Sequence, residues 1–164
     1  SMSSASTNDV RRPRGVLVFL AVWALLQLPR FIAVPLIADV AAGTESDAWM
    51  YPAVLDIVAA VAAIPVAALL FFRRGLLPWV LGILFFTVSI IDHGDAVTAA
   101  LLSTTPEVFG GEGAPASARF VPALQAVLDV VALVLLSRRS TRAWFGVLPA
   151  PQTEDAAEPS LQRA

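Results

Sequence analysis

The sequence predicts an all-α integral membrane protein, a four-helix bundle with four transmembrane helices and both termini cytoplasmic. Of its 164 residues, 57% are hydrophobic and 15% are charged, whereas a soluble domain carries roughly 25% charged residues. The mean hydropathy is +0.75. The chain contains four apolar runs of about 20 residues or more, the length that a helix needs to cross a bilayer.

The four predicted spans cover residues 15–40, 51–72, 76–102 and 118–137. Pro52 suits the first turn of the second span, where a missing N–H breaks no helical bond. The arginines before the first run would also fit a secretory signal. However, that run is too long for one and contains Gln27, Pro29 and Arg30, so we interpret it as a span.

Polar segments flank the membrane domain. We expect residues 1–14 to form a flexible cytoplasmic arm, in which Ser1 and Met2 are interpreted as the remnant of a cleaved tag. Residues 138–164 are expected to form a cytoplasmic, mostly disordered tail, because beyond its arginines this segment is rich in Pro, Ala, Glu and Asp.

The placement of arginine predicts the orientation in the cell membrane. One side of a four-span topology carries Arg11, Arg12, Arg14, Arg73, Arg74, Arg138, Arg139 and Arg142. The other side carries Glu45, Asp47, Glu107 and Glu112, with Arg119 as its one arginine. Because cytoplasmic loops are enriched in Lys and Arg, both termini are predicted to be cytoplasmic.

Composition excludes several kinds of chemistry. The chain has no cysteine, which rules out disulfides, thiolate metal sites and a cysteine nucleophile. It also has no lysine, which rules out a Schiff base with retinal or pyridoxal phosphate. The net charge of −2 indicates no nucleic-acid partner. We expect no cofactor.

Every predicted span carries ionisable side chains between the middle and the outer end. With a rise of about 1.5 Å per residue, Arg30 lies about 22 Å beyond the start of the first span. Asp92 lies about 24 Å beyond the start of the third. Asp56 lies about 8 Å, and Asp129 about 15 Å, from the outer ends of their spans. Because charged side chains avoid lipid, we expect them to face the bundle interior.

Helical spacing indicates which polar side chains share a face. These are Trp23, Gln27 and Arg30 on the first span, Ser89, Asp92 and Asp95 on the third, and Gln125 and Asp129 on the fourth. His93, the one histidine, is turned about 100° from Asp92 and away from Asp95. We therefore rank Asp92 above His93 as a candidate functional residue. Trp23 is interpreted as a packing aromatic.

Arg30 has two interpretations, a structural ion pair with one aspartate or a charge that serves a function. A single arginine does not neutralise Asp56, Asp92 and Asp129 together. At least one carboxyl group is therefore expected to be protonated, bound to a cation or reached by water.

A metal centre is an alternative at the third span. Asp92 and Asp95, three residues apart, can hold a cation jointly. Oxygen ligands alone would favour Mg, Ca or Mn, and the addition of His93 would favour Zn. The spacing matches no metal-binding motif.

The leading functional hypothesis is an outward-facing intramembrane site that binds a small cation, an amine-type ligand or protons, in a transporter-like or ligand-binding protein. The predicted site comprises Gln27, Arg30, Asp56, Asp92, His93, Asp95, Gln125 and Asp129. The first three aspartates of this set would hold the cation, with Asp129 as a deeper acceptor. Because the inner half of the bundle is almost entirely apolar, transport would require oligomerisation.

Two other classes remain open. One is an intramembrane aspartate-based hydrolase that uses Asp56 and Asp92. In size and topology the chain is similar to lipoprotein signal peptidases, but the catalytic aspartates of that family lie in asparagine-containing motifs. The only asparagine here is Asn8, so we do not assign that family. The other class is a non-catalytic subunit or assembly factor of a membrane complex. The expected partners are the lipid bilayer, a small cationic ligand, and a second copy or another membrane subunit.

Overall fold

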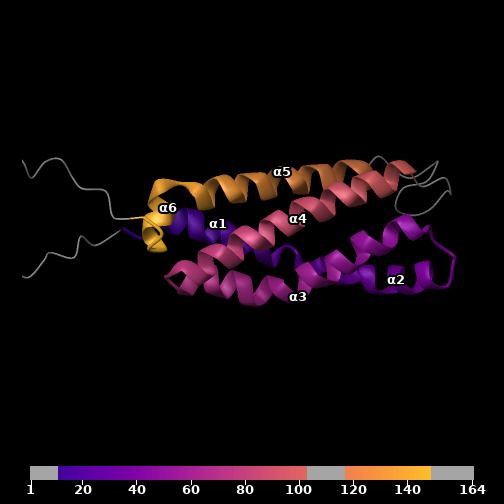
Figure 1. Ribbon diagram of the computed structural model, residues 1–164, viewed down its shortest axis with the longest axis horizontal. Helices are drawn as coiled ribbons and strands as arrows, with labels where there is room; N and C mark the ends of the chain where they lie inside the picture. The colour runs from indigo at the N-terminus through magenta and orange to yellow at the C-terminus, as the bar shows by residue number, and fades with distance from the viewer. Residues whose placement is uncertain (1–10, 103–116, 149–164) are drawn as a thin grey trace, which may run out of the picture.

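The computed structural model describes residues 11–102 and 117–148, and these residues form helices without any β-strand. The elements, in order, are α1 (Arg14–Leu25), the 3₁₀-helix η1 (Leu28–Ile32), α2 (Ala33–Ala41), the 3₁₀-helix η2 (Asp47–Trp49), α3 (Met50–Phe72), α4 (Leu76–Leu102), α5 (Ser117–Ser137) and α6 (Arg139–Trp144). Figure 1 shows that the long helices run side by side in an elongated bundle.

Among the described residues, four helical stretches are long and apolar enough to cross a membrane, which suggests a membrane protein. They cover Arg14–Ala41, Asp47–Phe72, Leu76–Thr98 and Phe120–Ser137. Many large apolar side chains lie on the outside of the bundle; Ile32 and Val61, for example, are 68% and 62% exposed. Such exposed apolar surface is stable in lipid, because lipid tails are as apolar as these side chains.

The first candidate span, Arg14–Ala41, covers the predicted residues 15–40 but is not one continuous α-helix. It consists of α1, η1 and α2 in succession. The helix α1 ends at Leu25, and Pro29 has no N–H to donate to the Leu25 carbonyl, so the α-helical ladder does not continue. The N–H of Arg30 instead donates to the carbonyl of Gln27, three residues back, over 3.1 Å. This 3₁₀ geometry places Arg30 on a tighter turn than an α-helix would.

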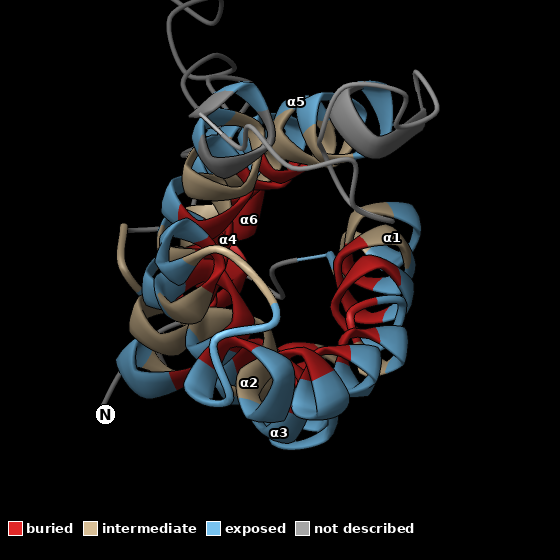
Figure 2. Ribbon diagram, turned by 90° about the vertical axis from the view of Figure 1, so that its right-hand side faces the viewer, coloured by how far each residue is buried: buried red, intermediate tan, exposed pale blue. Residues whose placement is uncertain are grey.

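The helix α3 packs against α1, η1, α2 and α4, and α4 packs in turn against α5. Small residues allow this close packing. The alanines of α3 that are buried are Ala53, Ala59, Ala60, Ala63 and Ala67. Figure 2 shows that the buried positions of the helices face one another around the centre, while the exposed positions face outward.

The two ends of the bundle differ. At the termini end lie the start of α1, the turn between α3 and α4, and α6; at the distal end lie the end of α2 and η2 (Figure 1). Gly75, with φ +112°, adopts the left-handed conformation that lets the chain reverse between α3 and α4.

The start of the expected tail is ordered. Residues 139–144 form α6, and Thr141, Trp144 and Phe145 are buried against the bundle. Hydrophobic burial explains this order, since Trp144 and Phe145 join the main apolar core. The remainder of the predicted tail, residues 149–164, lies outside the described residues, as do residues 1–10 of the predicted arm and Glu107 and Glu112 of the loop 103–116.

Candidate functional site

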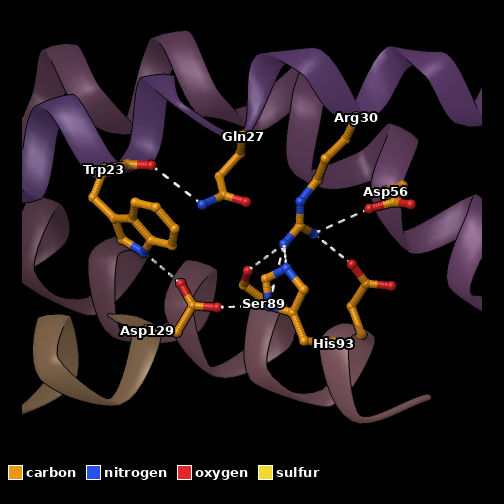
Figure 3. Close-up of polar contacts among 8 residues, drawn as sticks. Trp23, Gln27, Arg30, Asp56, Ser89, His93 and Asp129 are labelled. Atoms are coloured by element: carbon orange, nitrogen blue, oxygen red, sulfur yellow. Dashed lines mark hydrogen bonds and ion pairs between the residues drawn. The ribbon is translucent and has the colours of Figure 1, made fainter. Parts of the chain in front are cut away.

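A buried polar cluster surrounds Arg30, which is only 7% exposed. Its Nη1 donates to Asp92 Oδ2 and lies 3.4 Å from Asp56 Oδ1. Its Nη2 donates to Ser89 Oγ over 2.9 Å and contacts the ring nitrogen Nε2 of His93. The guanidinium thus lies between α3 and α4 and contacts side chains of both (Figure 3).

The cluster continues from His93 to α5 and α1. His93 Nδ1 lies 2.9 Å from Asp129 Oδ2, and Trp23 Nε1 donates to Asp129 Oδ1 over 2.7 Å. Because Arg30 has only donors, His93 Nε2 must accept from it. We therefore assign the proton of neutral His93 to Nδ1, which donates to Asp129. This assignment makes Asp129 the acceptor of two hydrogen bonds.

The local sequence explains how these side chains meet. Ser89, Asp92 and His93 are spaced at i, i+3 and i+4, so they lie on one face of α4. The break at Pro29 turns Arg30 toward that face, and the planar guanidinium reaches several partners at once. Trp23 on α1 and Asp129 on α5 lie on the side of the cluster opposite Asp56 (Figure 3).

Carboxyl groups outnumber the guanidinium in the cluster. Asp56, Asp92 and Asp129 are all within the network, but Arg30 is its one guanidinium and His93 is assigned as neutral. Asp92 and Asp129 are 2% and 0% exposed, whereas the side chain of Asp56 is 31% exposed. Asp56 is therefore the carboxyl group that a ligand can reach.

Several buried polar atoms of the cluster have no hydrogen-bond partner among the described residues. These are Asp92 Oδ1, Gln27 Oε1 and Arg30 Nε. Buried polar atoms without partners are rare in folded proteins and usually indicate a bound water, an ion or a functional role. The amide nitrogen of Gln27 does have a partner, since it donates to the carbonyl of Trp23 over 3.2 Å.

A pocket of about 120 Å³ adjoins Asp56 on the distal side of the cluster. Its walls include Ile32, Leu36, Trp49, Pro52 and Ala96, and among the described residues Asp56 is the one charged residue that lines it. A single water needs only roughly 10–15 Å³, so the pocket has room for a small organic molecule. Apolar walls with one carboxyl group are suited to a ligand that carries both a positive charge and an apolar part.

The structure brings together five of the predicted site residues: Arg30, Asp56, Asp92, His93 and Asp129. Gln27 lies next to them (Figure 3). Asp95 and Gln125 are half-buried, and neither side chain forms a hydrogen bond or ion pair with the described residues. The members that the sequence did not assign to the site are Trp23 and Ser89.

His93 lies closer to the centre of the cluster than its helical angle indicated. Both His93 and Asp92 contact Arg30, whereas Asp95 lies outside the network. His93 is four residues after Ser89 and therefore lies on the same face of α4. It occupies the place in the cluster that we expected for Asp95. One feature of the sequence indicated the polar role of Trp23, because helical spacing places Trp23 on the same face of the first span as Gln27 and Arg30.

No group of three or more His, Asp or Glu side chains within the described ranges is arranged to hold a metal ion. Both nitrogens of His93 already face Asp129 and Arg30. An imidazole needs a free nitrogen lone pair to bind a metal. The polar cluster therefore does not present the Asp92, Asp95 and His93 ligand set as a metal centre.

Comparisons with protein-family models, with curated proteins and with solved structures gave no match for this chain.

Proposed function

We propose that this protein is a multi-pass protein of the cell membrane that binds a small organic ammonium ion at Asp56. One observation carries the proposal: a partly exposed carboxyl group in an apolar pocket belongs to a buried cluster in which carboxyl groups outnumber the guanidinium. Asp56 would pair with the ammonium group, and the apolar walls would bury its alkyl part. Trp49 lines the same pocket, and an indole ring adds attraction for a cation.

The buried cluster would hold Asp56 in place at the pocket. Arg30 Nη1 is shared between Asp92 and Asp56, and the longer separation of 3.4 Å is to Asp56. Asp56 is therefore the less neutralised of the two. The guanidinium contact with both carboxyl groups also favours binding over hydrolysis, because an aspartate pair that hydrolyses a bond must act on a water or substrate instead.

The network supports binding rather than conduction through one subunit. Its last member toward the termini end is Trp23, whose indole nitrogen is a donor only and cannot pass a proton onward. The residues that continue the core in that direction are apolar, including Leu17, Leu20 and Phe86. A cation or proton that enters at Asp56 would therefore leave by the same side.

The orientation in the membrane is part of the proposal. The arginines at 11, 12, 14, 73, 74, 138, 139 and 142 belong to the segments at the termini end. By the positive-inside rule this end faces the cytoplasm. The pocket beside Asp56 then opens toward the outside, where it would take its ligand from the external medium.

The test is ligand-dependent thermal unfolding of the purified protein in detergent, with n-butylammonium chloride as the probe. We expect the probe to stabilise the folded protein, by about 2.7 kcal/mol when its concentration is 100 times Kd. Sodium chloride at equal ionic strength and n-butanol serve as controls for salt and for the apolar chain. Neither control should produce the same rise in Tm.

Two matched variants locate the effect. Asp56→Asn should abolish the stabilisation by butylammonium, whereas Asp95→Asn removes a carboxyl group outside the network and should retain it. Ala96→Leu keeps Asp56 but fills the pocket, so it should also abolish the effect even if Asp56→Asn fails to fold. Equal stabilisation of the parent protein, Asp56→Asn and Ala96→Leu would contradict the proposal, and so would the absence of any stabilisation of the parent beyond sodium chloride.

A further inference from the structure

A second cavity, of about 1000 Å³, lies at the termini end of the bundle and has the opposite charge. Arg11 and Arg12 line it from the segment that leads into α1, Arg14 lines it from the first position of α1, and Arg74 lines it from the turn before α4. No acidic side chain of the described residues lines it. None of these arginines forms an ion pair within the described part of the chain.

Two of the arginines are held in position by aromatic rings. The guanidinium carbon of Arg74 lies 3.6 Å from the ring centroid of Trp144, and that of Arg12 lies 4.6 Å from the ring centroid of Phe71. Arg12 also donates from Nη2 to the carbonyl of Phe71. A stacked arginine keeps its in-plane donors available for a second partner. The positive charge in the cavity is therefore positioned rather than diffuse.

Two of the lining residues carry a buried donor without a partner. Arg12 Nε and Trp144 Nε1 are buried, and neither has a hydrogen-bond acceptor among the described residues. The start of α1 adds backbone donors, because it has no side-chain cap and no acidic residue in its first turn. A Cβ on Gly15 would meet no atom within 4 Å, so the space beside these N–H groups is open. Helix N-termini of this kind bind phosphate groups.

We propose that this cavity binds the phosphate-bearing headgroup of an anionic phospholipid. Guanidinium groups and helical N–H groups both recognise phosphate oxygens. The surface beside the cavity favours a lipid as the source of the phosphate, since Phe72, Leu76 and Leu77 at this end are 76%, 61% and 63% exposed. Acyl chains can lie along these apolar side chains while the headgroup occupies the cavity. The site is separate from the Asp56 pocket, and its test does not depend on the proposed ammonium binding.

The experiment measures thermal unfolding of the full-length protein in detergent micelles doped with phosphatidylglycerol, cardiolipin or phosphatidylcholine. A separate arm replaces the lipids with sodium phosphate. We expect the anionic lipids to raise Tm in a saturable manner, with little effect of phosphatidylcholine or inorganic phosphate. An equal rise with inorganic phosphate alone would overturn the assignment to a lipid.

Two pairs of substitutions with the same change in net charge distinguish the cavity from general basicity. Arg12→Gln/Arg74→Gln removes two guanidinium groups from the cavity, and the apparent affinity should fall by about fivefold for each charge lost. Arg138→Gln/Arg139→Gln removes two exposed arginines that do not line it, and should retain the affinity. Equal losses in both pairs would overturn the proposal.

A third variant keeps all charges. Gly15→Leu places a side chain in the open space beside the N–H groups of α1 and should weaken the lipid effect, whereas Tm without lipid should stay unchanged or rise slightly. This variant remains decisive if the Arg12→Gln/Arg74→Gln protein does not fold, because an undiminished lipid effect in Gly15→Leu would contradict the headgroup site.

Discussion

Arg30 shows why one guanidinium can organise residues from several helices. Its two terminal nitrogens contact Asp92, Asp56, Ser89 and His93. A lysine would offer one compact ammonium group, whereas the planar fork of arginine presents separate donors in fixed directions. Removal of one partner of a buried ion pair is costly, because the other charge is left without compensation.

We therefore predict that Arg30→Met destabilises the folded protein by about 3–5 kcal/mol. The double variant Arg30→Met/Asp92→Leu should recover most of this loss, because it removes both charges and replaces them with apolar side chains. Reversible unfolding in mixed micelles gives both free energies. If the double variant were as unstable as Arg30→Met, the pairing with Asp92 would not be the source of the effect.

Single-residue geometry also explains why His93 joins the hydrogen-bond network and Asp95 does not. On α4, both residues lie within reach of a polar face that includes Ser89 and Asp92. A helical wheel gives the angles between side chains but not the direction of the neighbouring helix. The position of η1 selects the part of the face with His93, and Asp95 lies outside the hydrogen-bond network.

At the element scale, prolines and small residues determine how the helices meet. Pro29 ends the α-helical ladder of the first span and creates the 3₁₀ turn that carries Arg30. Gly82 determines how closely the helices pack, because a Cβ at this position would lie 2.8 Å from Leu70 Cδ2 and 3.2 Å from Leu136 Cδ1. The absence of a side chain at Gly82 allows α4 to approach both α3 and α5 closely.

Gly82→Ala should therefore destabilise the bundle. Overpacking should cost about 1–3 kcal/mol, and better helix propensity should offset up to about 1 kcal/mol of this loss. Leu70 and Leu136 are both fully buried, so neither has free space to move into. The matched control is Gly94→Ala on the same helix, where a Cβ meets no atom within 4 Å. This control should leave stability unchanged or raise it slightly. Chemical unfolding of both variants measures the difference, and equal effects would contradict the packing argument.

At the scale of the whole molecule, the two candidate sites lie toward opposite ends of the bundle. The arginine-lined cavity is at the termini end, and the Asp56 pocket lies beside α2 and η2 toward the distal end (Figure 1). Between the arginine-lined cavity and Trp23, the nearest member of the polar cluster, the core is apolar. This separation of charge along the long axis suits a bilayer, in which polar groups are stable near the two surfaces.

The cysteine-free sequence makes the proposed orientation directly testable. Thr44→Cys lies after α2, and Ser140→Cys lies in α6; both positions are exposed. In intact cells a membrane-impermeant maleimide should label Thr44→Cys, whereas Ser140→Cys should react only after permeabilisation. The reverse pattern would contradict the cytoplasmic placement of the termini, and labelling of both positions in intact cells would contradict a membrane-spanning bundle.

Much of the architecture follows from local sequence patterns. The third predicted span, residues 76–102, coincides with α4, and the second and fourth differ from α3 and α5 by one residue at the start. Long apolar runs fold as helices in lipid, because every backbone polar group must be satisfied within its own segment. The same reasoning predicted that buried charge would face the bundle interior.

The tertiary structure decided which polar groups meet. The sequence by itself determined that Arg30, Asp56, Asp92 and Asp129 lie at comparable depths, because the helical rise fixes depth along each span. It did not determine that Trp23 bonds to Asp129, that His93 joins the network, or that a pocket opens beside Asp56. These depend on the rotation and separation of neighbouring helices. Side-chain packing between distant segments sets both, and no local pattern records it.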